Sequence, residues 1–294
     1  MIESKEKKQD FNEIEIYQLI DFFKNGWKLL LTSIVLATII SSIYALSLDN
    51  IYRSKSTLMI TGMEQSFSSS GLSRITETFG FQVNSSDSKT TLVISTLSSR
   101  GFFKTILDDY KFLPQIAASS GFDISSNQLI LDDSEYDEQT QSWRPNKKPS
   151  FERAYRIFSK NLNVTEDNGL ITISYDHLSP VFAQEIILAI VEQINEIMRT
   201  RDLIESQNSI NFLKSKIQNE QILDIRSSLN QIMLNELKKE IFANIKKDFI
   251  LEYVDRPYIP ETKYSPQRSL IVLVTAFMSV IFAFMYIIFS GRYK

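Results

Sequence analysis

Two long stretches of the chain carry no charged side chain. They cover residues 29–48 and 269–291, which are 20 and 23 residues long. At 1.5 Å per residue, a helix of 20 residues is about 30 Å long and matches the hydrocarbon core of a bilayer. The pattern predicts two transmembrane helices that flank an external domain at 49–268. Short ends at 1–28 and 292–294 are expected in the cytoplasm, because five lysines precede the first span.

The segment before the first span mixes apolar and charged residues from 13 to 28. This pattern suits an interfacial helix and, equally, a plain extension of the span. A cleaved signal peptide is disfavoured, because the charged lead is 28 residues long and the apolar run exceeds the usual length of a signal peptide.

Shorter patterns divide the external segment. Tyr52–Ile60 is predicted to be a strand, and the Ser- and Gly-rich stretch 61–89 a mobile loop with a short helix. Residues 90–110 have helical spacing that is interrupted at Gly101. The acidic, proline-containing stretch 123–150 predicts a long surface loop.

Turn and cap signals place the next elements. Ser150 is expected to cap a helix that contains 153–160. The Asn168–Gly169 step between two alternating runs predicts a β-hairpin. Ser179 and Pro180 are suited to the N-cap and the first position of a further helix.

A heptad seam follows Pro180 and predicts self-association. Its apolar members are spaced 4, 3, 4, 3 and 7 residues apart. They are Ala183, Ile187, Ile190, Ile194, Ile197 and Ile204. A single helix over 180–218 would be about 58 Å long and would project from the domain. Two or three shorter helices in a compact bundle, within 180–250, are the alternative.

Small residues and prolines predict two further contacts. Small residues recur four apart in both spans and allow close helix packing in lipid. They are Ser33, Ala37, Ser41, Ala45, Thr275, Ser279 and Ala283. Pro257, Pro260 and Pro266 keep a three-residue phase, which predicts a stiff, extended linker over 255–268.

Composition and motifs argue against catalysis. The external segment has 25 basic and 29 acidic residues, so no nucleic-acid binding is expected. The chain has no cysteine, and its single histidine, His177, has no set of metal ligands around it in the sequence. The carboxylates at 132–138 are interpreted as a solvated loop. We expect no enzymatic activity, no catalytic residue, no cofactor and no metal.

Four segments resemble the Wzz-type chain-length determinants of bacterial surface polysaccharides, the polysaccharide co-polymerases. They are 12–21 with the span and Tyr52 that follow it, 97–102, 171–180, and 233–268 with its proline-rich end. Ser179 stands where the family has Asp, and either residue can cap a helix. The proline that the family has before the position of Tyr52 is missing.

The resemblance implies an α+β fold with a small mixed α/β base near the membrane and a long projecting helix. It implies a homo-oligomer of the inner membrane that regulates the chain length of an O-antigen-like lipopolysaccharide without catalysis. The expected partners are a separate polymerase, a lipid-linked glycan or growing polysaccharide, and membrane lipids. The chain ends three residues after Gly291, so the kinase-less form is expected.

Other functions remain as alternatives. One is an export subunit for capsule or exopolysaccharide, or a membrane adaptor of a separate tyrosine kinase. A two-span sensor is disfavoured because the cytoplasmic ends are short, and a membrane-anchored enzyme because no catalytic pattern is found.

Overall fold

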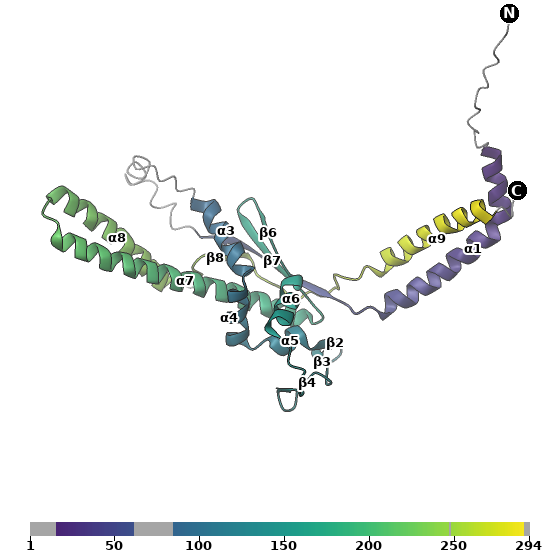
Figure 1. The fold of residues 1–294 in the computed structure, drawn as a ribbon, viewed down its shortest axis with the longest axis horizontal. Coiled ribbons are helices and arrows are strands. Elements are labelled where there is room, and N and C mark those ends of the chain that lie inside the picture. Colours follow the sequence, from purple (N-terminus) through teal and green to yellow (C-terminus); the bar gives the residue numbers. More distant parts are fainter. Residues whose placement is uncertain (1–15, 62–84, 247, 291–294) are drawn as a thin grey trace, which may run out of the picture. The chain divides into compact units, whose positions relative to one another are not determined.

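The computed structural model describes residues 16–61, 85–246 and 248–290 (Figure 1). The chain divides into one unit of Met1–Asn50 with Ser265–Lys294 and a second unit of Ile51–Tyr264. The start of the expected N-terminal segment, most of the expected loop at 61–89 and the tail at 292–294 lie outside the described residues.

The first unit is an antiparallel pair of apolar helices, α1 (Ile16–Ser47) and α9 (Arg268–Ser290). Both are long and apolar enough to cross a bilayer, over Trp27–Ser47 and Arg268–Tyr286. Helix α1 runs without a break from Ile16, so 16–28 continues the spanning helix and does not form a separate interfacial helix.

The seven small residues of the two spans lie at buried or half-buried positions along α1 and α9. Ser41 and Ala45 on α1 and Ala283 on α9 are buried. At one end of the pair, Leu30 packs with Ala283. At the other end, Arg268 donates to the carbonyl oxygens of Ala45 (2.9 Å) and Leu48 (3.0 Å). These carbonyls have no partner within the helix, so Arg268 caps the end of α1.

A four-stranded antiparallel sheet forms the centre of the second unit. Its strand order is β6 (Leu162–Asp167), β7 (Leu170–His177), β1 (Tyr52–Ile60) and β8 (Leu251–Asp255). The predicted strand β1 and the β6–β7 hairpin are confirmed. Asn168 and Gly169 both have positive φ, at 51° and 78°, as a tight hairpin turn requires.

Helices cover one face of this sheet. They are α3 (Ser85–Leu97), α4 (Arg100–Tyr110), α5 (Leu113–Ala117), α6 (Phe151–Asn161) and the first half of α7 (Pro180–Asn219). The predicted caps are confirmed, since Ser150 accepts from the Arg153 amide (3.2 Å) and Ser179 from the Phe182 amide (3.2 Å).

Two predictions for this unit are wrong in detail. The interruption in 90–110 falls at Ser98–Ser99, where Ser99 caps α4, and Gly101 lies inside the first turn of α4. The stretch 123–150 is not only loop. It holds β3 (Gln128–Leu131), which pairs with β2 (Ser119–Asp123), and the short pair β4 (Tyr136–Asp137) and β5 (Ser142–Trp143).

Helix α7 is a single helix of 40 residues and therefore about 60 Å long. Its second half leaves the sheet and pairs with α8 (Leu223–Ile245) as a helical hairpin (Figure 1). The single-helix alternative is confirmed, and the compact bundle of two or three helices is wrong.

Asn195, in the middle of α7, fixes where the chain returns from the hairpin to the sheet. Its Oδ1 accepts from the amides of Ile250 (2.9 Å) and Leu251 (2.8 Å), and its Nδ2 donates to the Leu251 carbonyl (3.0 Å). All three bonds are buried. They hold the start of β8 against α7 at one register.

We predict that Asn195→Ala lowers the stability of the full chain by about 3 kcal/mol, because buried backbone groups lose their partner. For a unit of this size the melting temperature should fall by about 6–12 °C. Asn208→Ala is the control, since Asn208 is exposed on the same helix. Thermal unfolding in detergent checks this, and equal melting temperatures of the two variants would contradict the assigned role.

Candidate assembly site

The six residues of the heptad seam have two different environments. Ala183, Ile187, Ile190 and Ile194 have no exposed surface and belong to the subunit's own core. A side chain covered by its own chain cannot contact another subunit, so the seam prediction is corrected at these four positions. Ile197 is half-buried against the same core, whereas Ile204 is 59% exposed.

The reason is that one face of α7 changes its surroundings along the helix. Up to Ile197 this face packs on the sheet and its covering helices. Beyond that point the base ends, and Ile204 and Phe212 are about 60% exposed (59% and 60%). Apolar periodicity identifies the face but does not tell what covers it.

Helix α8 carries a second exposed apolar row. It consists of Leu223, Leu234, Ile241 and Ile245, spaced 11, 7 and 4 residues apart, which places them on one side of a helix. Each is more than half exposed. We call this set the α8 row, and Ile204 with Phe212 the α7 pair.

The hairpin as a whole exposes ten large apolar side chains. Besides the α7 pair and the α8 row, they are Ile222, Ile225, Ile232 and Phe242. Soluble monomers rarely expose apolar patches of this extent, and such patches mark interaction surfaces. The sequence prediction found only Ile204 among these residues. The apolar spacing within 223–245 was the signal that would have found the α8 row.

A polar contact interrupts the seam between the two helices of the hairpin. Ser206 on α7 is buried and donates to Glu236 Oε2 on α8 (3.2 Å). Glu236 also pairs with Lys239 at 3.0 Å. Ile210 and Leu213 continue the buried seam beyond it. A partly buried polar pair among apolar neighbours favours one register of the two helices.

The proline-containing linker lies against β1. Pro257 and Pro260 are buried, and Pro266, which belongs to the first unit, is half-buried. Gln184 on α7 donates to the Pro257 carbonyl (2.9 Å), and Ser54 on β1 donates to the Tyr258 carbonyl (2.7 Å). The linker up to Tyr264 is therefore attached to the second unit by side-chain hydrogen bonds as well as stiffened by proline.

Arg53 joins three segments at the end of the sheet. Its guanidinium forms a bidentate pair with Asp176 on β7, at 2.5 and 2.6 Å. The same group lies 3.6 Å from the centre of the Tyr264 ring. The Tyr264 amide donates to the Ile51 carbonyl (2.8 Å), so the two ends of the second unit are bonded to each other.

Comparison with known proteins gives one match to a protein family. Residues 12–110 match the family model described as "Wzz: Chain length determinant protein". This segment includes two of the four places on which the resemblance depends, namely 12–21 with the span and Tyr52 that follow it, and 97–102. The match covers 99 of the 294 residues. No curated protein matches the sequence.

Two solved structures align with most of the chain. One is a "full-length bacterial polysaccharide co-polymerase", with 11% identity, TM-score 0.40, and coverage of 93% of this chain and 96% of that one. The other is a fragment of WzzB from Salmonella Typhimurium, with 12% identity, TM-score 0.38, and coverage of 74% and 100%.

The buried histidine lies beside a serine without forming a catalytic pair. His177 Nδ1 accepts from the Ser179 amide (3.1 Å), and Nε2 faces the Gln115 carbonyl at 3.0 Å. The proton is therefore on Nε2. Ser119 Oγ lies 3.2 Å from that same nitrogen. A general base needs a free lone pair toward the serine, and this tautomer has none there.

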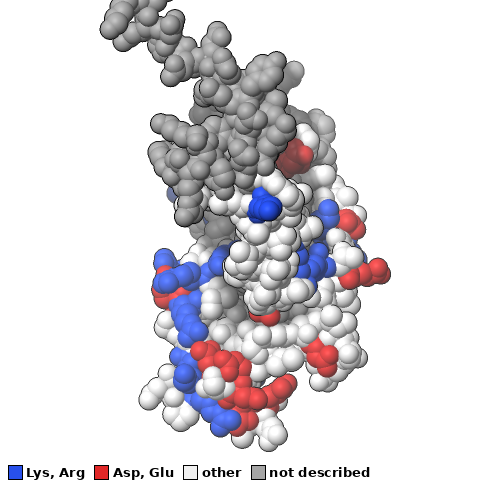
Figure 2. All heavy atoms as spheres, turned by 90° about the vertical axis from the view of Figure 1, so that its right-hand side faces the viewer, with Lys and Arg blue, Asp and Glu red and all other residues white. Residues whose placement is uncertain are grey.

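Three carboxylates of the 123–150 region stabilise turns. Asp123, Asp132 and Asp137 each accept from the amide two residues later, at 2.9, 2.9 and 3.0 Å. A hydrogen bond from the Thr140 amide lowers the pKa of Asp137. Acidic and basic side chains are intermixed in the lower part of Figure 2, where Figure 1 places β4. No group of three or more metal-binding side chains occurs within the described part of the chain.

We predict that His177 makes the fold sensitive to acid. Burial lowers the pKa of His177 from 6.5 to about 4. Between these pH values the unfolded chain binds a proton that the folded chain does not, so stability is lost as the pH falls. The loss should reach about 3 kcal/mol near pH 4.

The chain has no other histidine, so His177→Gln isolates this effect. Unfolding of the full chain in detergent, measured from pH 7 to pH 4, should show a shallower loss of stability for the variant. Identical pH slopes for the two proteins would show that His177 is protonated equally in both states.

Proposed function

We propose that the protein is a non-enzymatic, oligomeric co-polymerase of the bacterial inner membrane. It regulates the chain length of an O-antigen-like surface polysaccharide together with a separate polymerase. The match of residues 12–110 to the chain-length determinant family carries this proposal. Two helices of membrane-spanning length support the location.

The helical hairpin supports the oligomeric state. The α7 pair and the α8 row lie on different helices, and both leave apolar surface uncovered. In the proposed assembly the α7 pair of one copy packs on the α8 row of the next. Two different surfaces then meet, and a contact of this kind closes into a ring when the rotation between copies allows it.

The growing polysaccharide and its lipid carrier are the proposed ligands of the assembled protein. In this proposal the assembled protein positions its partners and does not react with them.

Deletion of the gene should shift or broaden the length distribution of the surface polysaccharide without abolishing the polymer. Gel electrophoresis of the extracted glycan measures this, and restoring the gene should restore the parent pattern. An unchanged ladder would overturn the proposed function. Loss of all polymer would overturn it in favour of an export subunit.

The double variant Leu234→Asp with Ile241→Asp should weaken assembly and leave the subunit folded. Both side chains are more than half exposed, at 54% and 55%. Burial of the exposed half of two such side chains between subunits contributes about 1.5–3 kcal/mol, so the dissociation constant should rise at least about tenfold.

Ser227→Asp is the matched control, because Ser227 is exposed on the same helix and polar already. Native mass spectrometry and light scattering of the full chain in detergent give the oligomeric state. Unchanged oligomers in the double variant would contradict the role of the α8 row.

A further inference from the structure

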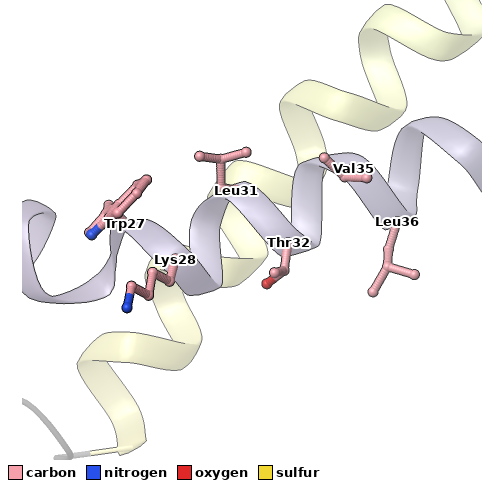
Figure 3. Close-up of a pocket in the computed structure, with 6 residues that line it drawn as sticks. All are labelled: Trp27, Lys28, Leu31, Thr32, Val35 and Leu36. Carbon is pink, nitrogen blue, oxygen red and sulfur yellow. The ribbon is translucent and has the colours of Figure 1, made fainter.

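Helix α1 carries a groove on the side turned away from α9. Trp27, Lys28, Leu31, Thr32, Val35 and Leu36 line a hollow of about 500 Å³ (Figure 3). All six side chains are exposed, whereas Leu30, Ser41 and Ala45 on the other side of α1 are buried. The groove therefore faces whatever surrounds the helix pair.

Two parallel ridges of side chains form the groove. Trp27, Leu31 and Val35 follow one another at four-residue steps, and Lys28, Thr32 and Leu36 form the adjacent row. Rows of this spacing are the ridges that run along a helix surface. Thr32 is the smallest member of its row, and its hydroxyl already donates to the Leu29 carbonyl (3.0 Å). The middle of the groove is thus shallow, open and apolar.

Apolar atoms line the groove, and polar groups lie beside one end of it. Trp27 and Lys28 are the first two residues of the groove, and the apolar spanning segment begins at Trp27. Figure 3 shows the indole nitrogen and the Lys28 ammonium group at the same end. A tryptophan N–H and an ammonium group are both donors without an acceptor function. This end lies where a helix of this length meets the head groups of a bilayer.

We propose that this groove binds one anionic phospholipid. The phosphate is held by Lys28 and the Trp27 indole, and an acyl chain lies between the two ridges along Leu31, Val35 and Leu36. Charge complementarity at one end and an apolar channel below it select this class of ligand. The proposal depends on α1 crossing a bilayer and is independent of the polysaccharide function.

The two tryptophans of the chain make the site measurable. They are Trp27 and Trp143, so Trp143→Phe leaves Trp27 as the sole indole. The full chain in this background is reconstituted into phosphatidylcholine vesicles that contain a minor fraction of brominated lipid. Bromine quenches an indole that it touches. Brominated phosphatidylglycerol is compared with brominated phosphatidylcholine at the same mole fraction.

We expect phosphatidylglycerol to be enriched about fivefold at Trp27, as one lysine near a membrane surface contributes about 1 kcal/mol with anionic lipid. Lys28→Gln should abolish the preference, and Lys28→Arg should keep it. Lys24→Gln is the matched control, since Lys24 lies one turn earlier in α1. This change should leave most of the preference intact. Thr32→Phe should fill the groove and weaken quenching by both lipids.

Several results would overturn the proposal. Equal quenching by the two brominated lipids means that Trp27 meets only bulk lipid. An equal effect of Lys24→Gln and Lys28→Gln means a general attraction to the surface. Displacement of the brominated phospholipid by a trace of polyprenyl phosphate assigns the groove to an isoprenoid carrier. Quenching that falls as the protein becomes denser in the vesicle assigns the groove to a second copy of the chain.

Discussion

The packing of the first half of α7 on the four-stranded sheet is the contact on which the second unit depends. Ile187, Ile190 and Ile194 are completely buried there, and each contributes about 1.5–3 kcal/mol of burial free energy. Asn195, on the same helix, accepts hydrogen bonds from the start of β8 and so fixes where the chain returns to the sheet. Because α7 is one continuous helix, the same contact fixes the direction in which its second half leaves the base. The hairpin with α8 is thus an extension of the core helix and not a separate domain.

This arrangement explains why the heptad pattern of α7 correctly predicts a helix but does not predict which residues contact another subunit. The apolar face of α7 serves the subunit's own core up to Ile197, whereas Ile204, seven residues later, is exposed. The heptad spacing continues across that boundary from Ile197 to Ile204. The extent of the sheet, which depends on the distant strands β1 and β8, decides where the base stops covering this face of α7. The α8 row was not predicted, because its members lie several helical turns apart and other residues separate them in the sequence.

Local signals were predictable and non-local ones were not. Caps such as Ser150 and Ser179, and the Asn168–Gly169 turn, depend on side chains within a few residues and were found from the sequence. The two long apolar helices were predictable because each is an uncharged stretch of membrane-spanning length. The hairpins within 123–150 were missed because their carboxylates resemble a solvated loop until each is seen to accept a backbone amide. The attachment of the linker to β1 joins residues about 200 positions apart, such as Ser54 and Tyr258.

Copies of this protein are proposed to assemble through the exposed faces of the hairpin. The chain has no cysteine, so single cysteines can be introduced and cross-linked in intact cells. Co-expression of an Ile204→Cys chain with a Leu234→Cys chain should give disulfide-linked dimers. An Ile190→Cys chain should give none, because that position is buried in its own subunit. Only monomers from the hairpin cysteines, or dimers through position 190, would contradict the account.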